Sequence, residues 1–214
     1  MATDKLKIYK GACIKAGTRI LGSLTEDVDR RHWLDEVWDD GGVDYCLEAG
    51  QWNFATRSTM LSYDSAIEPA FGWKRAFVKP SDWILTTAVA SDEFYRQPLL
   101  QYTDEGGVLY AELADIYVKY VSNADGFGMD YALWPSSFTE YVKAYFAYQI
   151  APKLSGGEEQ REALQKEMTS LLRMAKNRNQ IGLPTKFPAQ GSWNSSRGGR
   201  HTNRDRGSSR NFTG

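Results

Sequence analysis

The residues with the clearest capacity for chemistry lie near the C-terminus, where cations and aromatic rings occur together. Residues 184–214 contain six Lys or Arg and one Asp, a net charge of +5, with three large aromatic residues among them. Cations bind phosphates and aromatic rings stack on bases, so this segment is a candidate for nucleic-acid binding. It has one Arg-Gly-Gly, at 197–199, and no repeat of it. A basic tail also suits contact with an acidic protein or simple solubilisation, and the residues leave these alternatives open.

Residues that build enzyme or metal sites are few. The two histidines are His32 and His201, and the two cysteines, Cys13 and Cys46, lack the spacing of a metal site. We interpret the cysteines as small buried hydrophobic residues in a reducing compartment. No metal ion and no other cofactor is therefore predicted.

Acidic residues occur as adjacent pairs without a catalytic pattern. Glu158-Glu159 suits the start of a helix, and nothing distinguishes Asp39-Asp40 as catalytic. Phosphate-binding loops, dinucleotide-binding loops and nucleophile elbows do not occur in the sequence. We predict that the chain is not an enzyme. A carbohydrate-active enzyme, which needs two carboxylates placed by the fold, remains an alternative because aromatic residues make up 13% of the chain.

Composition assigns the rest of the chain to globular proteins. The 214 residues suffice for one domain with an extension or for two small domains. Residues 1–183 contain 20 of the 26 Lys or Arg and 26 of the 27 Asp or Glu, so an acidic body carries the basic tail. No apolar run is long enough to cross a membrane, and the first residues lack the apolar core of a signal peptide. We expect no membrane partner.

Apolar periodicity predicts four main helices, at about 4–21, 27–49, 137–154 and 158–181. Gly41-Gly42 in the second indicates a kink or a close backbone approach. Ser137 and Glu140 match a capping box at the start of the third. The fourth has an apolar stripe from Leu164 to Ala175 and is followed by a proline.

The β-structure is predicted between residues 76 and 122. A hairpin is expected with strands at 99–102 and 108–110, and residues 116–122 alternate with a two-residue period. We interpret 58–74 as loop with short extended pieces, and Trp83 as part of a short helix. The predicted fold class is mainly α: a bundle of four main helices with an inserted small antiparallel sheet. This domain spans 1–183, and an extended C-terminal tail spans 184–214.

Several short segments follow one another in a characteristic order. They are Gly50-Gln-Trp-Asn-Phe-Ala55, Ala76-Phe-Val-Lys-Pro-Ser-Asp82, Val118-Lys-Tyr-Val121, Trp134-Pro-Ser-Ser-Phe138, Phe146-Ala-Tyr148, Leu154-Ser-Gly156 and Ala175-Lys176. In this order they resemble the head-to-tail adaptor proteins of tailed bacteriophages, most closely the tail tubular protein A type of short-tailed phages. The resemblance covers about residues 4–182, and Pro152, in a helix end that is normally rich in alanine and leucine, departs from the pattern.

The resemblance implies a structural virion protein, a head–tail connector. Such adaptors form an oligomeric ring, usually a dodecamer, between the portal protein and the tail nozzle or tube. The expected partners are other copies of the chain, the portal, the nozzle or tube protein, and DNA that passes through the channel without sequence-specific recognition during genome ejection. The expected place is the virion neck at the portal vertex, after synthesis in the host cytoplasm.

The resemblance also implies that the C-terminal extension contacts the portal. We therefore expect the aromatic residues of the tail to act as anchors and its arginines to make charge contacts. The alternative function is a nucleic-acid-binding protein that uses the same tail. The expected portal-docking residues are Phe187, Trp193, Arg197, Arg200, Arg204, Arg206, Arg210 and Phe212.

Overall fold

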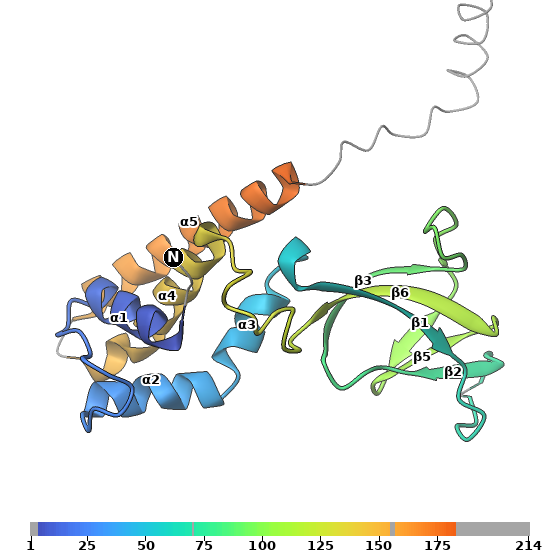
Figure 1. Ribbon diagram of the computed structural model, residues 1–214, viewed down its shortest axis with the longest axis horizontal. Helices are drawn as coiled ribbons and strands as arrows, with labels where there is room; N and C mark the ends of the chain where they lie inside the picture. Colours follow the sequence, from blue (N-terminus) through green and yellow to red (C-terminus); the bar gives the residue numbers. More distant parts are fainter. Residues whose placement is uncertain (1–3, 70, 155–156, 183–214) are drawn as a thin grey trace, which may run out of the picture. The chain divides into compact units, whose positions relative to one another are not determined.

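The computed structural model describes residues 4–69, 71–154 and 157–182. The chain forms two units, Met1–Gln180 and Ile181–Gly214. The described residues form five α-helices and two three-stranded antiparallel sheets (Figure 1). The fold class is mixed α and β, so the predicted mainly α bundle of four helices with a small insertion is wrong. The prediction fails because it assigns one strand to a loop and another to a short helix. It also joins two separate helices into one.

Three helices precede the sheets, and the predicted extents of both N-terminal helices are wrong. The first ends early because Thr18 N donates to Cys13 O at 2.9 Å, the bond that closes a helix C-terminus. The predicted helix 27–49 is broken at Gly41, whose φ of 82° is a left-handed conformation that ends the first half. The helices are α1 (Lys5–Lys15), α2 (Asp29–Asp39) and α3 (Gly42–Glu48).

Two helices follow the sheets, α4 (Ser136–Ile150) and α5 (Glu158–Ile181). The predicted capping box at the start of α4 is wrong, because Pro135 is the N-cap residue and no side chain caps the helix. Glu140 instead pairs with Lys143 at 2.8 Å. The predicted end near 154 is also wrong, since α4 gives way to the short 3₁₀ helix η2 (Ala151–Lys153), which contains a proline.

The first sheet has the strand order β1-β6-β3, with all neighbours antiparallel. The 3₁₀ helix η1 (Asn53–Ala55) leads directly into β1 (Thr56–Ser62), so β-structure begins well before residue 76. The loop interpretation of 58–74 is wrong for 58–62, which belong to β1, and is confirmed for the described residues from 63 to 74. The predicted short helix at Trp83 is instead β3 (Trp83–Ala90), a strand rich in β-branched residues. The central strand β6 (Asp115–Ser122) includes the residues whose alternation predicted it.

The second sheet has the order β2-β5-β4, from β2 (Arg75–Val78), β5 (Val108–Ala111) and β4 (Thr103–Glu105). The predicted hairpin exists, but its first strand lies at 103–105 and the prediction of 99–102 is wrong. Gly106 and Gly107, with φ values of 57° and 83°, form the two-residue turn, and this turn fixes the register of Glu105 opposite Val108.

Two hydrophobic cores hold the fold together. The helical core lies among α1–α5, where Tyr9 and Phe146 both contact Trp38. Part of the first sheet contributes to it, since Val121 is fully buried there. The sheet core is smaller and lies between the strands, where Phe77, Leu109 and other apolar residues are fully buried.

Candidate interaction surfaces

The side chains that could bind a metal ion are the described His, Cys, Asp and Glu residues, which include the two cysteine thiols. Among the described residues, no three His, Cys, Asp or Glu side chains lie together in a way that could hold a metal ion. Cys13 and Cys46 are free and buried, as predicted. Burial raises the pKa of both thiols, and a buried protonated thiol is chemically inert. Of the helices that the structure describes, none has the length and apolar composition needed to cross a bilayer.

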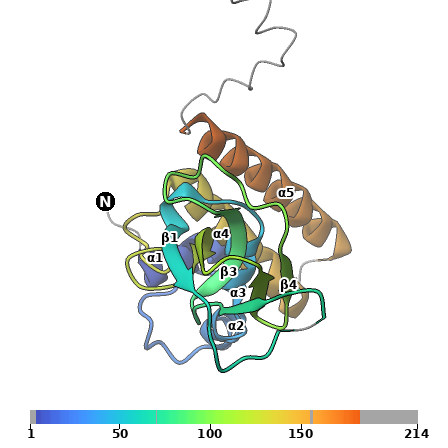
Figure 2. The same cartoon turned by 90° about the vertical axis from the view of Figure 1, so that its right-hand side faces the viewer.

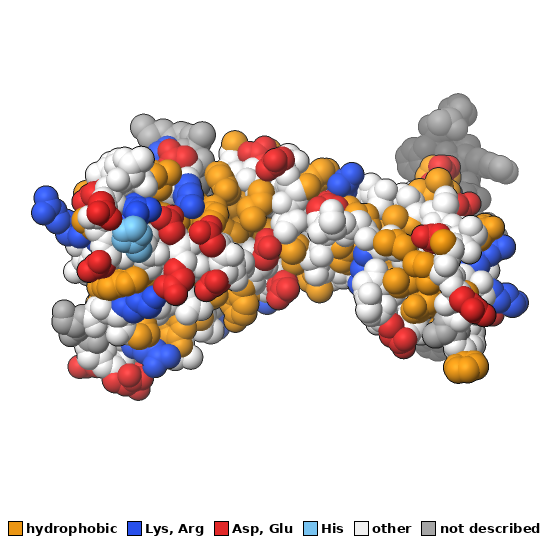
Figure 3. Space-filling view, turned by 90° about the horizontal axis from the view of Figure 1, so that it is seen from below, with side chains coloured by type: hydrophobic (Ala, Val, Ile, Leu, Met, Phe, Trp, Pro, Cys, Tyr) orange, Lys and Arg blue, Asp and Glu red, His pale blue; other side chains and the backbone are white. Residues whose placement is uncertain are grey.

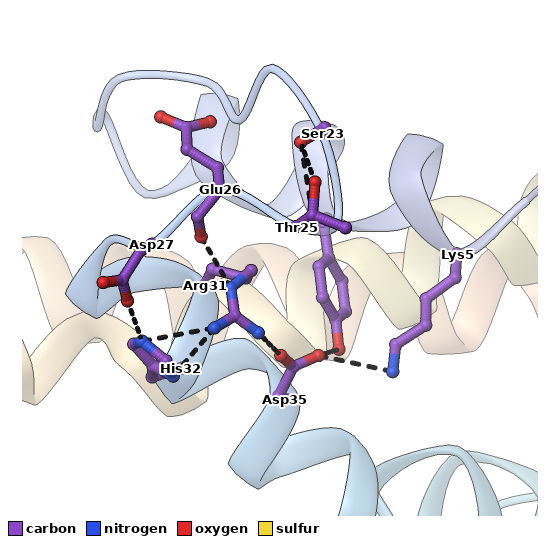
Figure 4. Close-up of polar contacts among 9 residues, drawn as sticks. Lys5, Ser23, Thr25, Glu26, Asp27, Arg31, His32 and Asp35 are labelled. Carbon is purple, nitrogen blue, oxygen red and sulfur yellow. Dashed lines mark hydrogen bonds and ion pairs between the residues drawn. The ribbon is translucent and has the colours of Figure 1, made fainter.

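A polar cluster in the helical part is centred on Asp35 of α2 (Figure 4). Tyr9 Oη donates to Oδ1 at 2.8 Å, and Arg31 donates to Oδ2 at 2.6 Å. Burial by itself would raise the pKa of Asp35, but the hydrogen bonds from Tyr9 and Lys5 outweigh it, so the pKa is lowered. Burial and then the bond to Asp35 raise the pKa of Tyr9. Because every group has a partner, this cluster ties α1 to α2 and offers no free reactive group.

Arg31 extends this cluster into the loop before α2 (Figure 4). Its Nε donates to the backbone oxygen of Glu26 at 2.6 Å, and its guanidinium lies 3.1 Å from His32 Nδ1. His32 Nε2 lies 2.9 Å from Asp27 Oδ1, a bond that lowers the pKa of Asp27. The Asp27 side chain is 96% exposed, so solvent screens the pair and it contributes little to stability.

A second polar cluster lies where the strands of the first sheet end. Asp82 precedes β3 and accepts hydrogen bonds from Ser122 Oγ at 2.5 Å and from Arg57 at 2.9 Å. Tyr120 Oη lies 3.2 Å from the same carboxylate, and burial, followed by the Asp82 charge, raises the pKa of Tyr120 to about 12. The cluster joins β1, β3 and β6 and is a structural element.

Four acids at the end of α2 and along α3 form what we call the acidic face. None of them forms an ion pair with another described residue, and no Lys or Arg occurs between residues 34 and 49. Figure 3, viewed from the side where α2 and α3 lie, shows acidic side chains gathered over the helical part. The face therefore carries uncompensated negative charge. Its members are Asp39, Asp40, Asp44 and Glu48.

Three cations in the last turns of α5 form a surface of opposite charge, which we call the basic end of α5. Arg173, Lys176 and Arg178 are all exposed, and none forms an ion pair within the described part of the chain. No acid occurs between residues 168 and 180. Cations are favoured at this end of a helix by its dipole, but the helix carboxyl end neutralises only part of their charge.

The helices α2 and α5 lie on different sides of α4, while Lys176 of the basic end lies beside Gly50, just after α3. Figures 1 and 2 both show α2 on one side of α4 and α5 on the other. Three contacts fix the position of α5: Leu164 and Ala175 are buried in the helical core, and Lys15 of α1 pairs with Glu167 at 2.6 Å. Near its end, Asn179 Nδ2 donates to Gln51 O at 2.6 Å. These contacts hold α5, and with it the basic end, against the rest of the helical part.

The sequence-predicted portal-docking residues all lie outside the described residues. The structure therefore brings none of them together, and their docking role stays a prediction. These residues are Phe187, Trp193, Arg197, Arg200, Arg204, Arg206, Arg210 and Phe212.

The acidic face and the basic end were not recognised from the sequence. Sequence reasoning considered Asp39-Asp40 only as a catalytic pair, without support, and assigned no surface to Arg173, Lys176 and Arg178. The available signal was charge segregation along the body: six acids without a base in 34–49, and three bases without an acid in 168–180.

The chain matches no protein-family model. It also matches no curated protein.

Proposed function

We propose that this chain is the head-to-tail adaptor of a tailed bacteriophage, a structural protein of the virion neck. Copies of it form a ring between the portal and the tail nozzle or tube, and the genome passes through the central channel. Its mechanism is assembly rather than catalysis: each copy joins its neighbours through two different surfaces that close into a ring.

The observation that carries this proposal is that two of the segments on which the family resemblance rests meet in space. Trp52 and Phe54 stand just before β1, Trp134 stands between β6 and α4, and Phe138 lies in the first turn of α4. The Phe138 ring lies 4.8 Å from those of Trp52 and Phe54 and 4.9 Å from that of Trp134. Aromatic contacts of this kind stabilise a site beyond the area they bury. These contacts hold together the two places where the chain passes from the helices to the sheets and from the sheets back to the helices.

The charge of the body supports the same proposal. Residues 1–183 carry a net charge of −6. A negatively charged channel wall repels the phosphate backbone, so DNA slides past without adhering to it. A ring subunit also needs two different surfaces, and the described part of the chain offers the acidic face and the basic end of α5, with α2 and α5 on different sides of α4.

The test is electron microscopy of the purified protein mixed with tailless, DNA-filled capsids. The proposal predicts ring-shaped density at one vertex of each capsid. A chain truncated after Leu183 is the matched variant, and it should lose most of its capsid binding because the basic tail is the expected portal contact. Absence of capsid binding, together with salt-dependent binding of free DNA that the truncation abolishes, would replace the proposal with the nucleic-acid-binding alternative.

A further inference from the structure

We infer that the acidic face of one copy docks on the basic end of α5 of a second copy, and that this contact is the repeating interface between neighbouring copies. The inference rests on the proposed ring and adds to it which surfaces meet. It commits to one partner, a second copy of this chain.

The first step is that neither surface has an ion-pair partner among the described residues, although Asn123 Nδ2 donates to the Asp44 carboxylate at 3.2 Å. Most other charges of the helical part are paired: Lys5 and Arg31 with Asp35, and Lys15 with Glu167. Against this background, four acids on α2–α3 and three cations on α5 have no ion-pair partner among the described residues. Unneutralised charge of one sign destabilises the isolated chain by self-repulsion, and a surface of opposite sign relieves it.

The second step is that each surface carries an apolar side chain suited to an interface. Tyr45, in α3 beside the acidic face, is 54% exposed, and its ring stacks on that of Tyr145 at 4.9 Å. Met174, beside the basic end, is 47% exposed. Tyrosine and methionine are enriched in protein interfaces, and stacking holds the Tyr45 ring in place before docking. Each surface thus offers an apolar contact beside its charges.

The third step is geometric. A surface that pairs with a different surface of an identical chain makes a heterologous contact, which repeats from copy to copy. Asp39 and Asp40, at the end of α2, and the basic end of α5 belong to helices on different sides of α4, so one copy can use these two acids and the basic end at once (Figures 1 and 2). A partner that used only one of them, such as DNA on the basic end, would leave the acidic face without a role.

The experiment uses two charge-reversed full-length variants. One carries Asp39→Lys and Asp40→Lys, and the other carries Arg173→Glu and Lys176→Glu. All four side chains are exposed and make no ion pair with a described residue, so we expect both variants to melt like the wild type. A control, Glu93→Lys with Glu105→Lys, makes the same change of net charge as the first variant, on exposed positions of the sheet part.

Self-association is measured by sedimentation velocity at low and high salt, and the number of copies bound per capsid is counted by electron microscopy. We expect wild-type association to weaken with salt and each reversed variant to associate about tenfold or more weakly. The equimolar mixture of the two should recover association, because each reversed surface then meets a complementary one. The control should behave like the wild type.

Three results would overturn the inference. They are association of either reversed variant at the wild-type level, failure of the mixture to recover, and loss of association in the control. If rings still form in any of these cases, the proposed function survives and only the interface is wrong. If the wild type forms no assembly in solution or on capsids, the proposed function fails and the inference fails with it.

Discussion

The helical part and the sheet part of this chain are built on very different cores. The helical core contains linked aromatic rings: Trp52 contacts Phe138, and Trp38 contacts Phe146. The sheet core contains seven buried residues, of which Phe77 and Tyr120 are the aromatic ones. Since local stability follows the amount of buried apolar surface, the helical part should open last and the sheet part first.

From this difference we expect the helical part to be the more rigid of the two and the sheet part to adapt more easily. The helical part carries both charged surfaces, and under the proposed assembly these need a fixed geometry. The sheet part carries several exposed apolar side chains, among them Met60, Phe94 and Leu100. Under the proposed function, these suit contacts with neighbouring copies or with the next tail component, where adjustment is useful.

The largest expected effect comes from breaking the helical core. Phe138→Ala removes a fully buried ring that contacts Trp52, Phe54 and Trp134, and it should cost about 4 kcal/mol, the typical range for a large-to-small change in a core. Thermal and chemical denaturation would measure it. A variant with nearly wild-type stability would show that the aromatic lock is not the centre of the fold.

The next effect comes from the equivalent change in the sheet core. Phe77→Ala also removes a fully buried ring, yet its cost of about 3 kcal/mol should fall mostly on the second sheet. Hydrogen exchange should show loss of protection in β2 and β5, while α4 keeps its own. Equal loss of protection in α4 would mean that the two cores unfold as one.

A smaller effect concerns the polar cluster that supports the sheet part. Asp82→Ala removes hydrogen bonds from Ser122 and Arg57, and it should cost about 2 kcal/mol. Although burial opposes ionisation, these bonds lower the pKa of Asp82 in the folded state. Its stabilisation is therefore full above the unfolded-state pKa and is lost as the pH falls through the folded-state pKa.

The pH dependence gives this prediction its own check. Hydrogen exchange of β1, β3 and β6 is compared between the wild type and Asp82→Asn as the pH is lowered. The wild type should lose more protection than the variant over the acid range. Asp35 in the helical part also has a lowered pKa, so α1 and α2 should respond to acid equally in both proteins. Identical acid responses of the strands would contradict the role of Asp82.

The smallest effect tests how firmly the basic end of α5 is held. Asn179 accepts from Asn53 N at 2.9 Å and donates to Gln51 O at 2.6 Å. Asn179→Ala should cost about 1 kcal/mol, the net contribution of a typical hydrogen bond, and should raise exchange only in the last turns of α5. The exposed Asn177 provides a matched control, since Asn177→Ala should change neither stability nor exchange.

Strong local signals were enough to predict some elements. The range predicted for α5 follows its apolar stripe, its first acids and the proline beyond its end, all within one segment. The strand β6 alternates buried and half-buried residues from Ile116 to Tyr120 in the way that predicted it, while Val121 and Ser122 are both buried. In both elements the pattern depends on neighbours a few residues away, which a sequence displays directly.

Other elements depended on partners far away in the chain. The strand β1 has only Met60 and Leu61 as large apolar residues, and its pairing with β6 sets Thr59 opposite Val118. Nothing near β1 in the sequence indicates this partner, so the strand was missed. The fold class was wrong for this reason. The charged surfaces were missed because each charged residue was considered singly. What distinguishes these surfaces is that no residue of opposite charge lies nearby in the sequence.

The central claim is that this chain assembles into a ring. The most direct measurement is the mass of the purified protein, alone and with tailless DNA-filled capsids, by native mass spectrometry and electron microscopy. The account predicts a closed ring of about a dozen copies, in solution or at the capsid vertex. A chain that stays monomeric, ignores capsids and binds free DNA in a salt-dependent way would contradict it.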